Sequence, residues 1–290
     1  MKPAFLAIDW GTTNRRAYAM GADGTVIDTV RDDRGVLSLS ADDYPGELAA
    51  IRSRLGDLPA IAAGMVGSTR GWRDAPYLSA PADLPALATA TLKLEEHRFA
   101  IVPGVSLLAG DRADVMRGEE VQVLGAVAAG LAPPDALFCQ PGTHNKWVRV
   151  ESGRITDFAT AMTGELFALI RGHGILHGML DGPVADGPAF RRGLARGRGA
   201  TDLIVALFEV RAAVLLGTLD PADAAAFASG ILIGADVGTQ VAGQEVHLLA
   251  TGALADLYAA AIADADGRAV AVDSHAAFVA GIHRIWDLQP

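Results

Sequence analysis

Apolar runs alternate along the chain with polar, glycine-containing turns, a pattern typical of an α/β protein. The run Phe5-Leu6-Ala7-Ile8 predicts a buried strand, and residues 4–31 are expected to form a hairpin followed by a third strand. The glycine- and arginine-rich residues 182–199 are expected to form an exposed connection between helices. Further strands are expected at 60–63, 99–105, 137–140, 246–250 and 270–272, and helices at 42–55, 119–129, 203–216, 223–233, 253–263 and 274–286.

The turn that ends the first strand holds residues suited to phosphate binding. Asp9 is followed closely by Gly11, Thr12, Thr13 and Asn14. Backbone N–H groups and threonine hydroxyls in such a turn can point at a phosphate, and Gly11 leaves room for it. Asp9, at the end of a core strand, is placed to hold a hydrated Mg²⁺ beside that phosphate. The alternative interpretation is an ordinary hairpin.

The same pattern recurs later in the chain. An apolar run that ends at Cys139 is followed by Gln140, and Gly142-Thr143-His144-Asn145 aligns with Gly11-Thr12-Thr13-Asn14. An internal repeat of this kind indicates a duplicated structural unit. Two such hairpins facing each other would hold a nucleotide from both sides. Only the first copy, which carries Asp9, would hold the metal.

These motifs resemble those of the superfamily that contains acetate and sugar kinases, actin and chaperone ATPases. A further stretch around Gly252 is similar to the adenosine motif of that superfamily, with a strand, a glycine turn and a helix start. More narrowly, the chain is similar to the 2-dehydro-3-deoxygalactonokinase family. The motifs that carry this closer resemblance are Ile8-Asp9-Trp10-Gly11-Thr12-Thr13-Asn14-Arg15-Arg16, Gly64-Met65-Val66-Gly67-Ser68, Arg117-Gly118-Glu119-Glu120, Gln140-Pro141-Gly142-Thr143-His144-Asn145-Lys146-Trp147 and Met162-Thr163-Gly164-Glu165-Leu166-Phe167.

The resemblance implies a two-domain actin-like ATPase fold of the ribonuclease H-like kind, with duplicated mixed β-sheets flanked by helices. Residues 1–115 are expected to form the N-terminal subdomain. Residues 116–273 are expected to form the C-terminal subdomain, which carries the second phosphate hairpin and the adenosine motif. A closing helix at 274–290 is expected to pack back on the N-terminal subdomain.

The resemblance also implies an activity. The expected reaction is ATP-dependent phosphorylation of 2-dehydro-3-deoxy-D-galactonate at its 6-hydroxyl, in galactonate and galactose breakdown, with ATP and Mg²⁺ as cofactors. Either Lys146 or Arg15 would balance the charge on the transferred phosphoryl group. Asp9 is the expected metal ligand. The expected cofactor-binding residues are Gly11, Thr12, Thr13, Gly142, Thr143, His144, Asn145, Lys146 and Gly252.

A carboxylate is expected to accept the proton of the sugar hydroxyl. Glu119 and Glu120 fall in the first turn of a predicted helix, where carboxylates also simply favour the helix dipole. In phosphatases of the superfamily a Gly-Glu-Glu helix start supplies the catalytic carboxylate, so the resemblance selects Glu120. Asp111 and Asp114 are the alternative bases.

The sugar acid needs binding residues of its own. Arg70 and Trp72 lie in the loop after the strand that begins at residue 60. Arginine can grip a carboxylate with two hydrogen bonds and tryptophan can pack on a sugar face, although a plain surface turn is the alternative. Thr163 is expected to cap a helix whose N–H groups could meet an anion. The expected substrate-binding residues are Asn14, Arg15, Ser68, Arg70, Trp72 and Glu165.

Composition narrows the classes of protein. Hydrophobic residues at 51% and charged residues at 20% of 290 fit a compact globular protein. The net charge of -10 argues against nonspecific nucleic-acid binding, and no apolar run reaches membrane-spanning length. A single cysteine, Cys139, excludes a disulfide within the chain and fits a reducing cytoplasm.

The expected partners are therefore the sugar acid and ATP, without nucleic acid or membrane, and a homodimer stays open. No Gly-Lys dipeptide occurs and no Gly-x-Gly-x-x-Gly follows a strand, which argues against Walker-type NTPases and dinucleotide-dependent dehydrogenases. Two rival functions are left. One is another kinase or a polyphosphate-type phosphatase of the same superfamily, and the other is a non-enzymatic nucleotide-binding regulator.

Overall fold

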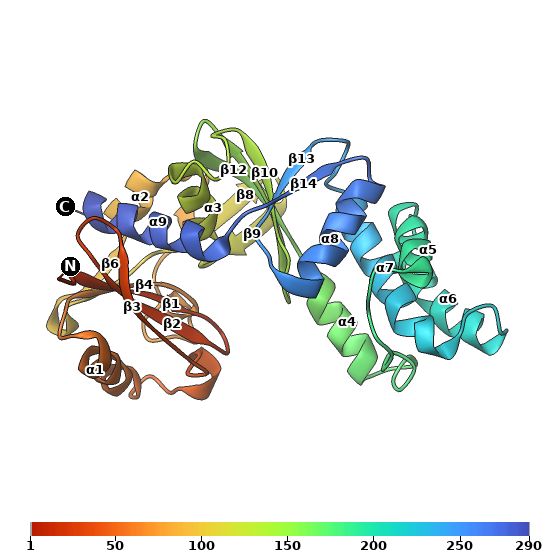
Figure 1. Ribbon diagram of the computed structural model, residues 1–290, viewed down its shortest axis with the longest axis horizontal. Helices are drawn as coiled ribbons and strands as arrows, with labels where there is room; N and C mark the ends of the chain where they lie inside the picture. Colours follow the sequence, from red (N-terminus) through yellow and green to blue (C-terminus); the bar gives the residue numbers. More distant parts are fainter. Residues whose placement is uncertain (1, 290) are drawn as a thin grey trace. The chain divides into compact units, whose positions relative to one another are not determined.

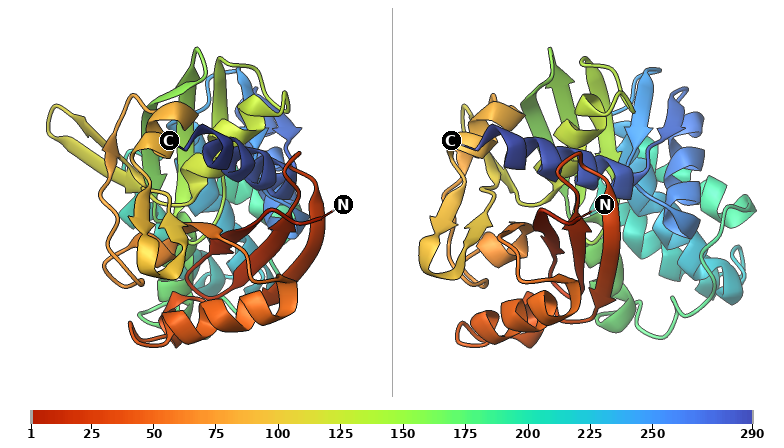
Figure 2. Two further views of the ribbon diagram at one scale, coloured as in Figure 1. Left: turned by 90° about the vertical axis from the view of Figure 1, so that its left-hand side faces the viewer. Right: turned by 60° about the vertical axis from the view of Figure 1, so that its left-hand side comes forward.

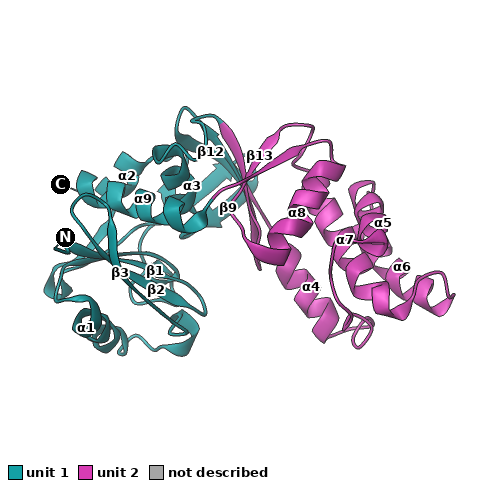
Figure 3. Cartoon of the chain, in the orientation of Figure 1, with its two compact units in different colours: residues 1–135, 148–158, 273–290 teal, residues 136–147, 159–272 magenta. Residues whose placement is uncertain are grey.

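The structure is a computed structural model that describes residues 2–289. Strands and helices alternate along most of the chain (Figure 1). The chain forms two compact units, coloured separately in Figure 3. Unit 1 contains residues 1–135, 148–158 and 273–290, and unit 2 contains residues 136–147 and 159–272.

Unit 1 is built on a six-stranded mixed sheet in the order β3-β2-β1-β4-β7-β6. The central strands β1, β4 and β7 are parallel, whereas β2, β3 and β6 run antiparallel to their neighbours. The expected hairpin and third strand within residues 4–31 are confirmed. The strands are β1 (Phe5–Trp10), β2 (Arg15–Met20), β3 (Val26–Asp32), β4 (Ala60–Gly64), β6 (Leu92–Leu94) and β7 (Phe99–Ile101).

Helices cover the sheet of unit 1. Helix α1 (Tyr44–Leu55) packs against β2 and β3 and buries Leu48 and Ile51. The last helix, α9 (Ser274–Leu288), contacts β1, β4, α2 (Leu84–Thr89) and α3 (Glu119–Ala128). Figure 2 shows α9 in dark blue with α3 beside it. The end of the chain therefore packs against strands from its beginning.

The expected strand at 99–105 is wrong in its extent. Strand β7 stops at Ile101, and after Pro103 and Gly104 the chain enters a separate sheet with the order β5-β8-β9. Proline has no N–H group to donate to a neighbouring strand, so Pro103 explains why the strand does not continue to residue 105. The strands of this small sheet are β5 (Leu78–Ser79), β8 (Val105–Ala109) and β9 (Arg112–Met116).

Unit 2 contributes to a five-stranded sheet in the order β12-β11-β10-β13-β14. Strands β10, β13 and β14 are parallel, with Phe138 opposite His247 and Cys139 opposite Leu248. The last part of β11, the turn after it and the first part of β12, residues 148–158, belong to unit 1. The strands are β10 (Ala136–Gln140), β11 (Asn145–Glu151), β12 (Arg154–Ala161), β13 (Glu245–Leu248) and β14 (Arg268–Ala271).

Helix α7 forms the centre of unit 2 and is buried along nearly its whole length. It contacts four other helices of the unit. The expectation of an exposed connection at 182–199 is wrong, because this segment contains helix α5, whose Phe190 and Leu194 are buried against α7. The helices are α4 (Thr163–Gly172), α5 (Pro188–Arg198), α6 (Leu203–Leu215), α7 (Ala224–Gly238) and α8 (Gly252–Asp264).

The subdomain boundary near residue 115 stays a prediction. The compact units divide the chain elsewhere, since unit 1 continues to residue 135 and includes α3, which follows that boundary. Across residues 2–289, every helix is too short or too polar to cross a membrane.

The contact between α3 and α9 gives a test of this packing. A Cβ atom on Gly281 would lie 2.1 Å from the carbonyl oxygen of Val121. Gly281→Ala should therefore push the helices apart and lower the free energy of unfolding by about 2 kcal/mol or more, measured by denaturant titration. Gly46→Ala in α1 is the control, since its Cβ would meet nothing within 4 Å and should change stability by less than about 1 kcal/mol. Equal stability of the two variants would contradict the close approach.

Candidate active site

The β1–β2 turn of unit 1 exposes backbone donors. The N–H of Gly11 donates to the carbonyl of Asn14 at 3.0 Å and closes the turn. The carbonyls of Gly11, Thr12 and Thr13 accept hydrogen bonds from the N–H groups of residues 35–37. Thr12 and Thr13 are exposed, and within residues 2–289 their own N–H groups have no acceptor. Occupied carbonyls and open N–H groups suit this turn to an anion such as phosphate.

Asp9 lies in a row with two arginines across the sheet. Strand pairing sets Asp9 opposite Arg16 on β2, and Arg16 opposite Arg31 on β3. Burial raises the pKa of Asp9 to about 6, Arg16 opposes that rise, and Glu119 adds to it. The Asp9 carboxylate accepts no hydrogen bond from the part of the chain that the structure describes. A cavity of about 520 Å³ is lined by Asp9, Asn14, Arg15, Arg16, Arg31 and Asp32.

These surroundings fit a hydrated magnesium ion. Mg²⁺ keeps several of its waters and is usually held by one or two carboxylates. Asp9 offers one carboxylate with free oxygens at the wall of the cavity. Among residues 2–289, no three His, Cys, Asp or Glu side chains cluster as a ligand set. A water-mediated ion on Asp9 is therefore the arrangement that these residues permit.

His275, on α9, contacts Arg31 at one end of this row. Its Nε2 atom lies 3.0 Å from Nη2 of Arg31, and its Nδ1 atom lies 2.7 Å from the hydroxyl of Tyr18. Because a guanidinium can only donate, Nε2 must accept and Nδ1 carries the proton. Burial and the charges of Arg16 and Arg31 lower the pKa of His275, which keeps the ring neutral.

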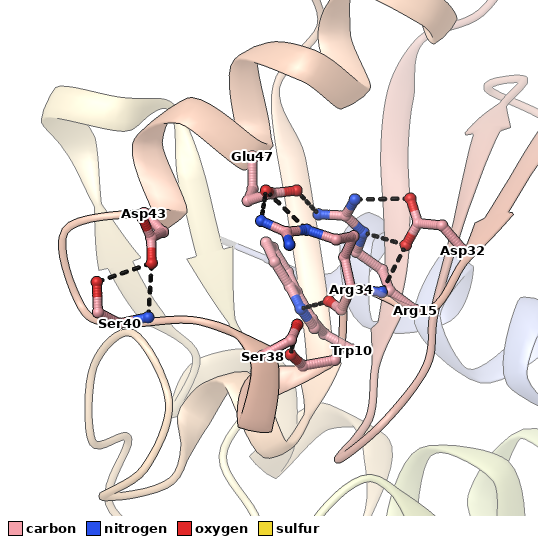
Figure 4. A network of polar contacts seen from close by, with 9 residues as sticks. Trp10, Arg15, Asp32, Arg34, Ser38, Ser40, Asp43 and Glu47 are labelled. Carbon is pink, nitrogen blue, oxygen red and sulfur yellow. Dashed lines mark hydrogen bonds and ion pairs between the residues drawn. The ribbon is translucent and has the colours of Figure 1, made fainter.

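Arg15, expected to bind substrate or to balance charge on the transferred group, also lines this cavity, but its side chain makes ion pairs. Its Nε and Nη2 atoms donate to the Asp32 carboxylate at 3.1 and 2.7 Å, and its Nη1 atom lies 2.9 Å from Glu47 (Figure 4). Its side chain is 4% exposed, with the guanidinium over the ring of Trp10. Arg15 is therefore committed to ion pairs, and Arg16 is the arginine beside Asp9.

Helix α3 begins at the same edge of the sheet. A Cβ atom on Gly118, the residue before α3, would lie 3.0 Å from Cα of Gly64 at the end of β4. Gly64 is paired with Trp10 at the end of β1. The start of α3 is thus placed at the carboxyl ends of β1 and β4, next to Asp9.

The two glutamates that open α3 have different surroundings. Glu120 is fully buried; its Oε2 atom accepts from the N–H of Gly118 at 2.7 Å, and its Oε1 atom has no partner among residues 2–289. Burial, with the charge of Glu119, raises the pKa of Glu120 to about 8. Glu119 is only half-buried and accepts from the N–H of Arg117. Glu119 is therefore partly exposed whereas Glu120 is enclosed, which argues against the expected role of Glu120 in this conformation.

Asp111 and Asp114 lie on the β8–β9 hairpin. Asp111 is exposed in the turn, and Asp114 is half-buried within β9. The turn is at the end of β9 remote from α3, about 15 Å along the strand. The hairpin thus separates Asp111 from the carboxylates at the start of α3.

The loop after β4 contradicts the role expected for Trp72. The Trp72 side chain is 3% exposed, and its ring stacks on Tyr44 and touches Phe99. It belongs to the core and cannot pack on a sugar. Ser68 Oγ donates to the carbonyl of Met65 and accepts from the N–H of Arg70, so it shapes the loop. The side chain of Arg70 itself is exposed.

The second phosphate turn, in unit 2, is backed by α4. The N–H of Glu165 donates to the carbonyl of Thr143 at 2.9 Å, and its carboxylate lies 2.6 Å from Nε2 of His144. A Cβ atom on Gly164 would lie 2.4 Å from the carbonyl oxygen of Gly142, so only glycine fits there. The positive end of the α4 dipole therefore lies next to the turn, as an anion site requires.

Two predicted nucleotide-binding side chains in unit 2 are buried. Asn145 is fully buried and donates to Asp236, which contradicts direct contact of its side chain with a nucleotide. Lys146 is 6% exposed and donates to the hydroxyl of Thr160. Thr163 does not cap α4, as its hydroxyl also donates to Asp236 and the helix starts without a side-chain cap.

The segment predicted as an adenosine motif has the expected form. Strand β13 leads through a short turn into α8, which begins at Gly252 with a φ of 70°. A small cavity of about 80 Å³ lies among the helices beside this start. It is lined by Gly142, Thr163, Gly164, Phe167, Ser229, Leu232, Ile233, Leu254 and Tyr258.

Comparison with known proteins places the chain in a family. The family model described as 2-keto-3-deoxy-galactonokinase matches residues 9–285. The chain belongs to this family. It is 38% identical to 2-dehydro-3-deoxygalactonokinase of Escherichia coli K12 and 37% identical to the probable 2-dehydro-3-deoxygalactonokinase DgoK1 of Rhizobium meliloti 1021, over 98% of each chain.

Solved structures agree with this membership. The crystal structure of a putative 2-dehydro-3-deoxygalactonokinase from Sinorhizobium meliloti superposes with a TM-score of 0.86 at 37% identity, over 96% of both chains. The activator of 2-hydroxyisocaproyl-CoA dehydratase from Clostridium difficile, solved with bound ADPNP, matches with a TM-score of 0.51 at 10% identity, over 98% of this chain and 94% of that one. The second likeness concerns the fold alone.

In this member of the 2-keto-3-deoxy-galactonokinase family, sequence analysis missed three polar residues. Arg16 and Glu119 are the sequence neighbours of the predicted residues Arg15 and Glu120. The side of the strand on which a side chain lies, and its burial, distinguish the two members of each pair. Asp236 accepts four hydrogen bonds inside unit 2, yet it lies in the apolar sequence of α7 with no motif around it.

The raised pKa of Glu120 gives a test by stability. Between its ordinary value of 4.5 and about 8, the folded protein binds more protons at Glu120 than the unfolded chain does. The free energy of unfolding should therefore fall as pH rises through this range, and Glu120→Gln should remove that component. Thermal unfolding at several pH values, with Glu95→Gln at an exposed position as the control, measures it. Parallel profiles for wild type and Glu120→Gln would disprove the buried, uncompensated carboxyl.

Proposed function

We propose that this chain transfers the terminal phosphoryl group of ATP to the 6-hydroxyl of 2-dehydro-3-deoxy-D-galactonate, in the cytoplasm. The observation that carries the proposal is the family match over residues 9–285, joined to 38% identity with the Escherichia coli enzyme over 98% of both chains. Several residues of this chain also support the proposed reaction.

Each phosphate turn offers donors for an ATP phosphate. In unit 1 the donors are the open N–H groups of Thr12 and Thr13. In unit 2 they are the exposed residues Thr143 and His144 together with the N-terminal end of α4. Phosphoryl transfer depends mainly on positioning and on neutralising charge, so backbone donors of this kind suit the reaction.

Asp9 and Arg16 supply the charges for the transfer. Asp9 would hold Mg²⁺ through water, and the ion when bound neutralises charge on the phosphates. Arg16 lies beside Asp9 on the same cavity and can neutralise negative charge on the transferred group without a metal. The raised pKa of Asp9, about 6, means that the carboxylate is ionised at neutral pH but protonated in mild acid.

We assign the proton-accepting role to Glu119 rather than to Glu120. Glu119 is accessible, opens α3, and lies close enough to Asp9 to raise its pKa. A general base must come within hydrogen-bonding reach of the hydroxyl that it deprotonates. The buried, partly unpaired Glu120 supports the start of the helix through the N–H of Gly118.

Turnover with defined acceptors tests the proposal. ATP consumption by the wild type should depend strongly on 2-dehydro-3-deoxy-D-galactonate within a panel of 2-keto-3-deoxy sugar acids, compared with a reaction lacking any acceptor. ATP loss that is independent of the acceptor would instead favour the phosphatase, and ATP binding without turnover would favour the regulator.

Arg70 gives a sharper prediction on substrate recognition. We propose that its exposed guanidinium binds the carboxylate of the sugar acid. Arg70→Ala should raise KM for the acid about tenfold or more, since a hydrogen bond to a charged group contributes about 1.5–3 kcal/mol. KM for ATP should not change. Arg73→Ala is the matched control, because Arg73 is an exposed arginine of the same loop whose side chain donates to the carbonyl of Trp72. Equal effects of the two variants would refute the assignment.

A further inference from the structure

Asp236 is the polar centre of unit 2. Its Oδ1 atom accepts from Nε1 of Trp147 at 2.8 Å. Its Oδ2 atom accepts from Nδ2 of Asn145 at 2.7 Å, from the hydroxyl of Thr163 at 2.8 Å and from the hydroxyl of Tyr258 at 2.7 Å. The residue is 8% exposed. We call these five residues the Asp236 network.

The donors come from the segments to which the proposed function assigns ATP. Asn145 directly follows the turn Gly142-Thr143-His144, and Thr163 is the first residue of α4. Tyr258 lies on α8, whose first residue is Gly252. A carboxylate on α7 therefore connects the phosphate turn, the helix that backs it and the helix of the adenosine motif.

Close packing transmits the position of this network to the turn. Gly164, next to Thr163, sits against Gly142 with no room for a Cβ atom, and the N–H of Glu165 donates to Thr143. On the other side, the Oδ1 atom of Asn145 lies 3.5 Å from Sγ of Cys139 on β10. A shift at Asp236 must therefore move the turn or break one of these contacts.

Only a carboxylate satisfies all four donors. Ionised aspartate is a pure acceptor with about four lone-pair sites, whereas asparagine presents an NH₂ group on one side. In Asp236→Asn, an amide nitrogen at Oδ2 would face the amide nitrogen of Asn145, and at Oδ1 it would face the indole N–H of Trp147. Either orientation leaves buried donors without an acceptor, and the surrounding segments must move.

We propose that Asp236 is a positioning residue for the nucleotide, which sets the geometry of the second phosphate turn through Asn145 and Thr163. This inference rests on the proposed function, because it assumes that the turn binds ATP. The positioning role and a purely structural role of Asp236 predict different effects of a substitution. A structural role predicts lost stability alone, whereas a positioning role predicts weaker ATP binding with sugar-acid binding retained.

The test is a split between two Michaelis constants. Asp236→Asn should raise KM for ATP about tenfold or more, since small misplacements of binding groups have large effects, and should leave KM for the sugar acid within about twofold. The control is Val210→Ala, which removes part of a buried side chain of α6 in a core cluster of unit 2 that contains no member of the network. That variant should lose stability and keep both constants.

Two further measurements keep the outcome decisive. If Asp236→Asn does not fold, Tyr258→Phe and Thr163→Val each remove one donor and keep the carboxylate, and each should raise KM for ATP about threefold. Calorimetry without any acceptor should also show weaker binding of a non-hydrolysable ATP analogue. The loss of affinity should be larger in Asp236→Asn than in Tyr258→Phe or Thr163→Val.

The outcomes separate this inference from the proposed function. Unchanged analogue binding in the variants, or equal rises in both constants, would overturn the role of Asp236. A wild type that binds the analogue but never phosphorylates the sugar acid would overturn the proposed function while the analogue series still tests Asp236.

Discussion

The register of β1, β2 and β3 decides which charged side chains can meet a ligand in unit 1. Successive side chains on a strand point to opposite faces, so Asp9, Arg16 and Arg31 share one face. Trp10, Arg15 and Asp32 share the other, where α1 brings Glu47. A slip of one residue in β2 would exchange Arg15 and Arg16 between the two faces. The two adjacent arginines therefore differ in their partners, since Arg15 makes ion pairs with Asp32 and Glu47 whereas Arg16 lies beside Asp9.

The two Gly-Thr-x-Asn turns are supported by different means. The first is held by hydrogen bonds from residues 35–37, and its Asn14 is exposed and bonds the hydroxyl of Thr13. The second is held by α4, and its Asn145 is turned inward to Asp236. The repeated sequence thus sets the path of the backbone. The neighbouring elements decide what the last side chain of each copy does.

Desolvation dominates the electrostatics of the unit 1 site. Burial is the largest cause of the raised pKa values of both Asp9 and Glu120. Carboxyls with such shifts, gathered at the carboxyl edge of parallel strands, are typical of functional sites. Burial of the Asp9 carboxylate is unfavourable, and a bound cation or the charge of Arg16 would offset the desolvation. This arrangement fits a phosphotransferase of the 2-keto-3-deoxy-galactonokinase family.

The sequence by itself determined most of the order of elements, the two Gly-Thr-x-Asn turns and the family, because these depend on local periodicity and on short motifs such as Gly11-Thr12-Thr13-Asn14. Tertiary structure decided which of two adjacent residues, such as Arg15 and Arg16, can meet a ligand, since the elements that pack around a side chain are often distant in sequence. Glu47 on α1 and Asp32 on β3 pair with the buried Arg15, the core buries Trp72, and Glu120 is fully buried within unit 1. The role of Asp236 could not be predicted from the sequence for the same reason. Its four donors lie between 22 and 91 residues away, and only folding brings them together.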